Sequence, residues 1–156
     1  MYIYFENEIS TETVNDLIGQ ISGHDKVTLY FSTEGGSPEA MRFLIDYLNS
    51  LGDAIEIVLT SYIASAGTFL LTHYKGKLSA KNLDYVLFHV IDRQNYNLRK
   101  DYSYSFSTIQ KQDVKSNKVF SKKLRTKGFL TEVQINNFLK GYDVVVYQKQ
   151  MKTWKL

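Results

Sequence analysis

A serine and a histidine with the chemistry of acyl transfer lie in the first 90 residues. Ser65 lies in the segment SYIASAGTFLL, and His89 lies in YVLFHVI. A serine hydroxyl becomes a strong nucleophile when a neighbouring imidazole takes its proton, and that imidazole needs a carboxylate to fix its tautomer. The pair therefore indicates nucleophilic catalysis, provided that the fold brings the two side chains together.

A carboxylate that could orient the imidazole occurs near the end of the chain. Asp143 follows Gly141-Tyr142 and opens a predicted last strand, so chain order favours it. Asp92, Asp101 and Asp113 are the competing candidates for the same role.

The developing oxyanion of an acyl transfer needs two fixed N–H donors. The backbone amides of Gly36, in the segment STEGGSP, and of Ala66, directly after Ser65, are the candidates. Each feature also has an ordinary structural interpretation: a helix cap for Ser65, a core residue for His89 and a turn for the glycine pair. Their joint position after predicted strands favours the catalytic interpretation.

No metal or cofactor is expected. The chain has no cysteine, and its histidines, aspartates and glutamates do not follow the spacing of metal ligands. Gly35-Gly36 lacks the glycine pattern of a dinucleotide or phosphate-binding loop. His24, in a predicted turn, and His73, at a predicted helix end, are interpreted as solvated residues.

Residues 1–92 show alternating strand and helix patterns, and these elements would position the candidate catalytic residues. The predicted strands are 2–5, 27–32, 55–60 and 85–91, and the predicted helices begin at Ser10 or Thr11, at Ser37-Pro38 and at Ala64. Short connections between such elements predict right-handed βαβ units and an α/β fold with a mainly parallel sheet. Ser65 and Gly36 then lie at the carboxyl ends of strands, where ligands bind in such sheets.

The rest of the chain is predicted to form an arm and a short terminal unit of the same single domain, 1–156. Residues 93–127 have a loose helical spacing (Phe106, Ile109, Val114, Phe120, Leu124), and residues 128–156 contain a helix with a Thr131–Gln134 capping box and a strand at 144–147.

Charge separates these segments. Residues 1–92 carry 5 Lys/Arg and 12 Asp/Glu, whereas residues 93–127 carry 10 Lys/Arg and 2 Asp/Glu. A basic, tyrosine-rich segment suits nucleic acid, but without an RNA-binding signature a solvated helical arm is favoured.

Composition fits one globular domain of 156 residues, with 44% hydrophobic residues and a single proline. No apolar run approaches the roughly 20 residues of a membrane span, and the N-terminus lacks a basic region followed by an apolar one. We therefore expect a cytoplasmic protein.

Three segments resemble the Clp protease proteolytic subunit family, within the Clp/crotonase superfamily. The family's strand, Asn-Ser-Pro-Gly-Gly turn and following helix resemble the segment VTLYFSTEGGSPEAMRFLIDYLNSL. Its nucleophile turn resembles the segment IEIVLTSYIASAGTFLLTHYKGKL. Its strand with the catalytic histidine resembles the segment LDYVLFHVI. The segment FLTEVQINNFLKGYDVVV resembles, more weakly, the part of the family that carries the acidic residue of the catalytic triad. Ser32-Thr33-Glu34, Ser61 and Ile63 depart from the family pattern.

The resemblance implies a serine endopeptidase with Ser65 as nucleophile, His89 as base, Asp143 as acid and Gly36 and Ala66 as oxyanion donors. It also implies a Clp/crotonase-like fold with a helical handle at residues 93–127, homo-oligomeric rings and peptide or protein substrates. The family's N-terminal axial loop and final helix have no counterpart here, which argues against docking of a Clp-type ATPase. The alternatives are a catalytically silent assembly or adaptor subunit, and a signal-peptide-peptidase-like hydrolase.

Overall fold

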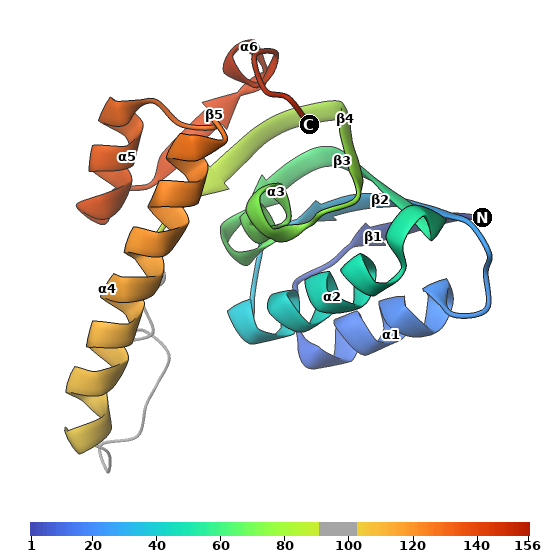
Figure 1. Ribbon diagram of the computed structural model, residues 1–156, viewed down its shortest axis with the longest axis horizontal. Coiled ribbons are helices and arrows are strands. Elements are labelled where there is room, and N and C mark those ends of the chain that lie inside the picture. Colours follow the sequence, from blue (N-terminus) through green and yellow to red (C-terminus); the bar gives the residue numbers. More distant parts are fainter. Residues whose placement is uncertain (91–102) are drawn as a thin grey trace. The chain divides into compact units, whose positions relative to one another are not determined.

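Strands and helices alternate along the first half of the chain in the computed structural model, which describes residues 1–90 and 103–156 and, for 103–110, the helical backbone alone (Figure 1). The strands are β1 (Tyr2–Glu6), β2 (Val27–Thr33), β3 (Ile55–Ala64), β4 (Lys77–Phe88) and β5 (Val144–Tyr147). The helices are α1 (Thr11–Ile21), α2 (Pro38–Ser50), α3 (Phe69–His73), α4 (Ser103–Thr126), α5 (Glu132–Leu139) and α6 (Gln148–Met151), with 3₁₀ turns η1 (Gly52–Ala54) and η2 (Ser65–Thr68).

Side-chain caps begin three of the helices at the predicted residues. The hydroxyls of Ser10, Ser37 and Thr131 accept hydrogen bonds from backbone N–H groups in the first turns of α1, α2 and α5. These N–H groups have no acceptor within the helix itself, so a serine or threonine at the cap stabilises the helix start. The three predicted caps are thereby confirmed.

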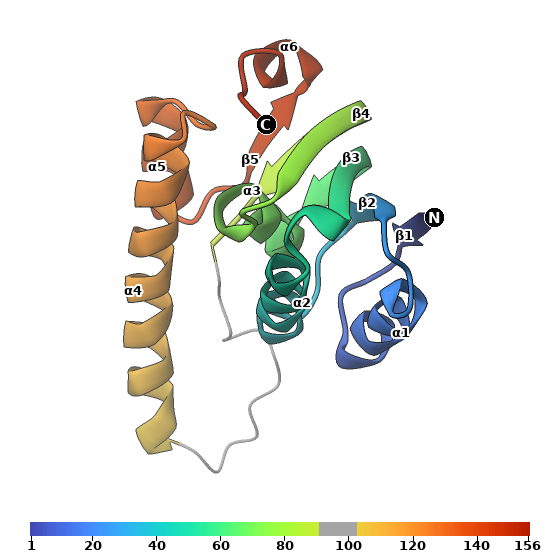
Figure 2. The ribbon, with the colours of Figure 1, turned by 45° about the vertical axis from the view of Figure 1, so that its right-hand side comes forward.

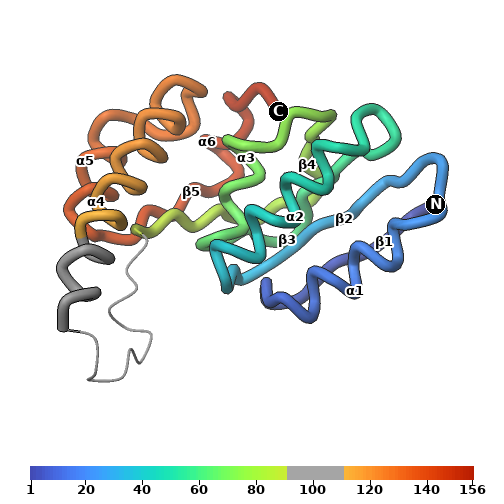
Figure 3. Tube along the Cα trace, turned by 60° about the horizontal axis from the view of Figure 1, so that its bottom comes forward, coloured from blue at the N-terminus to red at the C-terminus, as the bar shows by residue number. Residues whose placement is uncertain are grey.

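The strands form one sheet in the order β1-β2-β3-β4-β5, and β1 to β4 pair in parallel. The strands advance in sequence order, so right-handed crossovers place the helices on a single face, and α1, α2 and α3 all lie there (Figure 2). Figure 3 shows α1 and α2 side by side along that face. The core lies between these layers and contains Leu29, Phe31, Ile57 and Leu59, all completely buried. The predicted α/β class with a mainly parallel sheet is confirmed.

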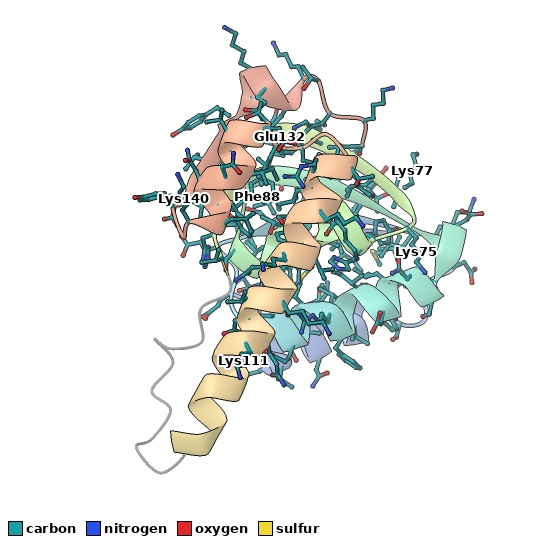
Figure 4. The ribbon with its side chains drawn as sticks, turned by 60° about the vertical axis from the view of Figure 1, so that its left-hand side comes forward. Lys75, Lys77, Phe88, Lys111, Glu132 and Lys140 are labelled. Carbon is teal, nitrogen blue, oxygen red and sulfur yellow. The ribbon has the colours of Figure 1, made fainter. Side chains whose placement is uncertain are left out.

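The chain divides into two compact units, Met1–Phe88 with Val145–Leu156, and His89–Val144. In the second unit, the rings of Phe120 and Phe138 pack edge to face at 6.0 Å and join α4 to α5. Arg125 donates two hydrogen bonds to Glu132, at 2.6 and 3.0 Å. Lys111 on α4 and Lys140 after α5, both labelled in Figure 4, belong to the same unit.

Two sequence expectations about α4 had different outcomes. Phe120 and Leu124 are buried as the helical spacing predicted, but Val114 is 51% exposed, so the expected apolar face of α4 is narrower than predicted. The side chains of Phe106 and Ile109 lie outside the described residues.

A bulge interrupts β3 just before the candidate nucleophile. The pairing of β3 with β4 shifts on both sides of Ser61, whose φ is +51°. Ser32, buried in β2, donates a hydrogen bond from its hydroxyl to the Tyr62 carbonyl oxygen at 3.1 Å. The predicted strand 55–60 therefore continues beyond the bulge to Ala64, which carries the chain to Ser65.

Replacing Ser61 by glycine is expected to stabilise the protein. A left-handed conformation costs a non-glycine residue about 1–2 kcal/mol. Glycine avoids this cost, but it loses more backbone entropy on folding, which destabilises the folded state by about 0.5–1 kcal/mol. We expect the free energy of unfolding to rise by about 0.5–1 kcal/mol, measured by urea denaturation. The Ser61→Val variant is the control and should be destabilised, because a β-branched residue tolerates this conformation poorly. Equal stability of the two variants would contradict the interpretation.

Candidate functional site

Ser65 occupies the sharp turn between β3 and the following helical segment. Ala64 is extended, with φ of −128°, whereas Ser65 has φ of +53° and begins the η2 turn. Such a conformation is rare for a residue other than glycine and is often retained at functional sites. The Ser65 side chain is half-buried, and its hydroxyl makes no hydrogen bond to any residue that the structure describes.

The Gly35-Gly36 turn packs directly against Ser65. A Cβ atom on Gly35 would overlap the Ser65 Cβ and would lie 3.0 Å from the Ser65 Oγ. Both glycines have left-handed φ values, +106° and +132°. Only glycine permits this turn and this close approach. The turn after β2 therefore needs two glycines, because it packs against the turn that follows β3.

The segment before α1 holds the glycine turn in place. The Ile9 N–H donates to the Gly35 carbonyl oxygen at 2.6 Å, and the Ser37 N–H donates to the Ile9 carbonyl oxygen at 2.8 Å. These bonds form a parallel bridge between Ile9 and Gly36. Sequence reasoning missed Ile9, because only its backbone takes part and no side-chain pattern signals it.

Two backbone N–H groups beside Ser65 remain available. The bridge to Ile9 uses the groups flanking Gly36, and within the described residues the Gly36 N–H itself has no acceptor. The Ala66 N–H lies in the first turn of η2, where a helix offers no internal acceptor. These are the two N–H groups that the sequence predicts as oxyanion donors.

Negative charge lies along the same edge of the sheet. Burial of the phenol, followed by the nearby carboxylates of Glu34 and Glu6, raises the pKa of Tyr62. Glu34 is exposed and directly precedes Gly35.

His89 follows the end of β4 rather than lying inside it. The strand ends at Phe88, a fully buried residue (Figure 4), and Ile91 of the predicted strand lies outside the described residues. The Nδ1 atom of His89 lies 3.0 Å from the Val90 carbonyl oxygen. Since a carbonyl oxygen only accepts hydrogen bonds, this contact requires the proton on Nδ1.

The candidate carboxylates differ in exposure. Asp143 is exposed and directly precedes β5, whereas Asp113 is 6% exposed on α4 and has an interaction partner. Asp92 and Asp101 lie outside the described residues.

Of the five predicted site residues, Ser65, Gly36 and Ala66 meet at one edge of the first unit. His89 and Asp143 belong to the second unit. Among the described residues, no three histidine, aspartate or glutamate side chains gather as metal ligands do. In the described part of the chain, every helix is too short or too polar to span a lipid bilayer.

Comparison with known proteins gives one type of match. Neither the protein-family models nor the curated proteins match this chain. Among solved structures, the chain is similar to a point mutant of ClpP1 from Listeria monocytogenes, with a TM-score of 0.67 and 18% sequence identity over 97% of this chain and 85% of the other. The comparison confirms the predicted Clp-like fold.

Proposed function

We propose that this protein is a serine peptidase of the Clp type, which cleaves peptide bonds through an acyl-enzyme. The observation that carries the proposal is the conformation of Ser65: a half-buried hydroxyl on a left-handed turn, beside the free N–H groups of Gly36 and Ala66. A nucleophile held on a tight turn between a strand and a helix is a recurrent arrangement in hydrolases. The similarity to a ClpP1 structure supports the same assignment.

Chain connectivity supports His89 as the general base. Ala64, which precedes Ser65, pairs with Leu87 in the sheet, and His89 is only two residues beyond Leu87. In the proposed reaction, Nε2 of His89 takes the proton of Ser65 while the oxygen attacks the peptide carbonyl. The imidazolium then gives the proton to the departing amine, and water later releases the acyl group.

The two free amides supply the electrostatic part of the mechanism. When the carbonyl carbon becomes tetrahedral, its oxygen gains a negative charge that fixed N–H donors stabilise. Gly36 and Ala66 contribute these donors without reorganisation, because the Ile9 bridge and the start of η2 already hold them.

Asp143 is proposed as the carboxylate that stabilises the imidazolium of His89. Its role is narrower than in a standard triad, because the Val90 carbonyl oxygen already selects the reactive tautomer. We further propose that the chain assembles with its own copies in the cytoplasm, in line with the family that its sequence resembles, and acts on peptides or unfolded proteins.

Reaction with a fluorophosphonate probe tests the proposal. The wild-type protein should form a Ser65 oxygen–phosphorus bond with loss of fluoride, and the Ser65→Ala variant should not. Ser61→Ala is the matched control, since Ser61 is another half-buried serine with left-handed φ in the same segment. The particle mass in solution is measured on the same samples. A folded, assembled wild-type protein that fails to react would favour the silent assembly subunit instead.

A further inference from the structure

Thr33 is a buried residue that the sequence reasoning did not assign to the site. It is the last residue of β2 and is 1% exposed. Its hydroxyl donates a hydrogen bond to the Asn7 carbonyl oxygen at 2.8 Å and accepts one from the Gly35 N–H at 3.0 Å. The hydroxyl thus links the segment before α1 to the glycine turn.

The methyl group of Thr33 faces the other half of the site. A Cβ atom on Gly67 would overlap the Thr33 Cγ2, so this methyl group lies against the backbone of the turn that carries Ser65. Thr33 also pairs with Ile63 in the sheet. One side chain therefore contacts both the turn of the nucleophile and the turn of the oxyanion donor.

We propose that Thr33 is a positioning residue that fixes the Gly36 N–H relative to Ser65. Two adjacent glycines have wide conformational freedom, and the hydroxyl of Thr33 restricts it by binding the amide of Gly35. The Gly36 N–H is then left pointing away from the Ile9 bridge. This inference rests on the proposed peptidase function and assigns Thr33 no contact with the substrate.

The hydroxyl and the methyl group can be separated by substitution. Thr33→Val keeps the shape and the methyl contact with Gly67 but removes the hydroxyl. Thr33→Ser keeps the hydroxyl and removes the methyl group. Thr28→Val is the matched control, because Thr28 lies on the same strand and its hydroxyl binds Glu56 instead of the glycine turn.

The experiment measures kcat and KM for a short peptide substrate, together with the rate constant of fluorophosphonate labelling. Misplacement of an N–H donor by a fraction of an ångström to 1 Å lowers a rate by about 10-fold to 100-fold. For Thr33→Val we therefore expect kcat and the rate constant of labelling to fall by about 10-fold to 100-fold, while KM changes little. Thr33→Ser and Thr28→Val should retain rates near those of the wild type.

A second measurement separates the inference from the proposed function. Hydrogen exchange of the Gly35 amide should accelerate in Thr33→Val and not in Thr33→Ser, whether or not the protein is a peptidase. If the wild type is unreactive, the peptidase proposal fails; if it reacts and Thr33→Val reacts equally fast, the positioning role alone is overturned. Should Thr33→Val not fold, Thr33→Ser and Thr33→Ala give the same contrast, since they differ only in the hydroxyl.

Discussion

Peptide hydrolysis by the His89→Ala variant is expected to fall by about 10⁴-fold or more in kcat/KM, because the Ser65 hydroxyl then has no base to take its proton. The fold should be little affected, since His89 is half-buried beyond the end of β4. Steady-state kinetics with a fluorogenic peptide measures the loss, and circular dichroism checks the fold.

Asp143→Asn is the informative comparison for the same reaction. In a standard triad this substitution costs about 10⁴-fold, because the histidine adopts the wrong tautomer. Here the Val90 carbonyl oxygen accepts the Nδ1 proton of His89, so we expect a loss of less than about 100-fold. A loss equal to that of His89→Ala would contradict this narrower role for Asp143.

Replacement of Gly35 by alanine should remove activity and weaken the fold together. The new methyl group would overlap the Cβ of Ser65 and would require an unfavourable φ of +106°. We expect labelling of Ser65 to slow by about 10²-fold to 10³-fold, as for loss of an oxyanion donor. The free energy of unfolding should fall by about 2 kcal/mol or more.

Gly19→Ala provides the control for that prediction. Gly19 is exposed in α1, and a Cβ atom there has nothing within 4 Å. Alanine should stabilise the helix by about 0.5–1 kcal/mol and leave labelling unchanged. If Gly35→Ala behaved like Gly19→Ala, the close packing of the glycine turn against Ser65 would be contradicted.

Local patterns in the sequence predicted where α1, α2 and α5 begin and most of the parallel sheet, but the helix predicted to begin at Ala64 was wrong, because Ala64 ends β3 and α3 begins at Phe69. Ser37-Pro38 and the Thr131–Gln134 box predicted where α2 and α5 begin, because capping involves residues three positions apart. The predicted end of β3 at Thr60 was too early, because the left-handed φ of Ser61 breaks the alternation without ending the strand. The first half of β4 is polar and exposed, so it gave no apolar signal.

The candidate site was predictable only where its residues follow strands. Ser65 and Gly36 could be predicted to lie together because the carboxyl ends of parallel strands share one edge. Thr33 and Ile9 act through hydrogen bonds to backbone atoms of segments distant in sequence. Such contacts depend on the folded chain and leave no spacing pattern, so the sequence could not reveal them.

The structure of the protein after reaction with a peptide boronic acid tests the central claim most directly. We expect a bond from the Ser65 oxygen to boron, with one boronate oxygen about 2.7–3.1 Å from the nitrogen atoms of Gly36 and Ala66 and the other facing Nε2 of His89. Boron bound to a different residue, or a Ser65 adduct whose oxygen avoids both amides and whose His89 lies out of reach, would contradict the account.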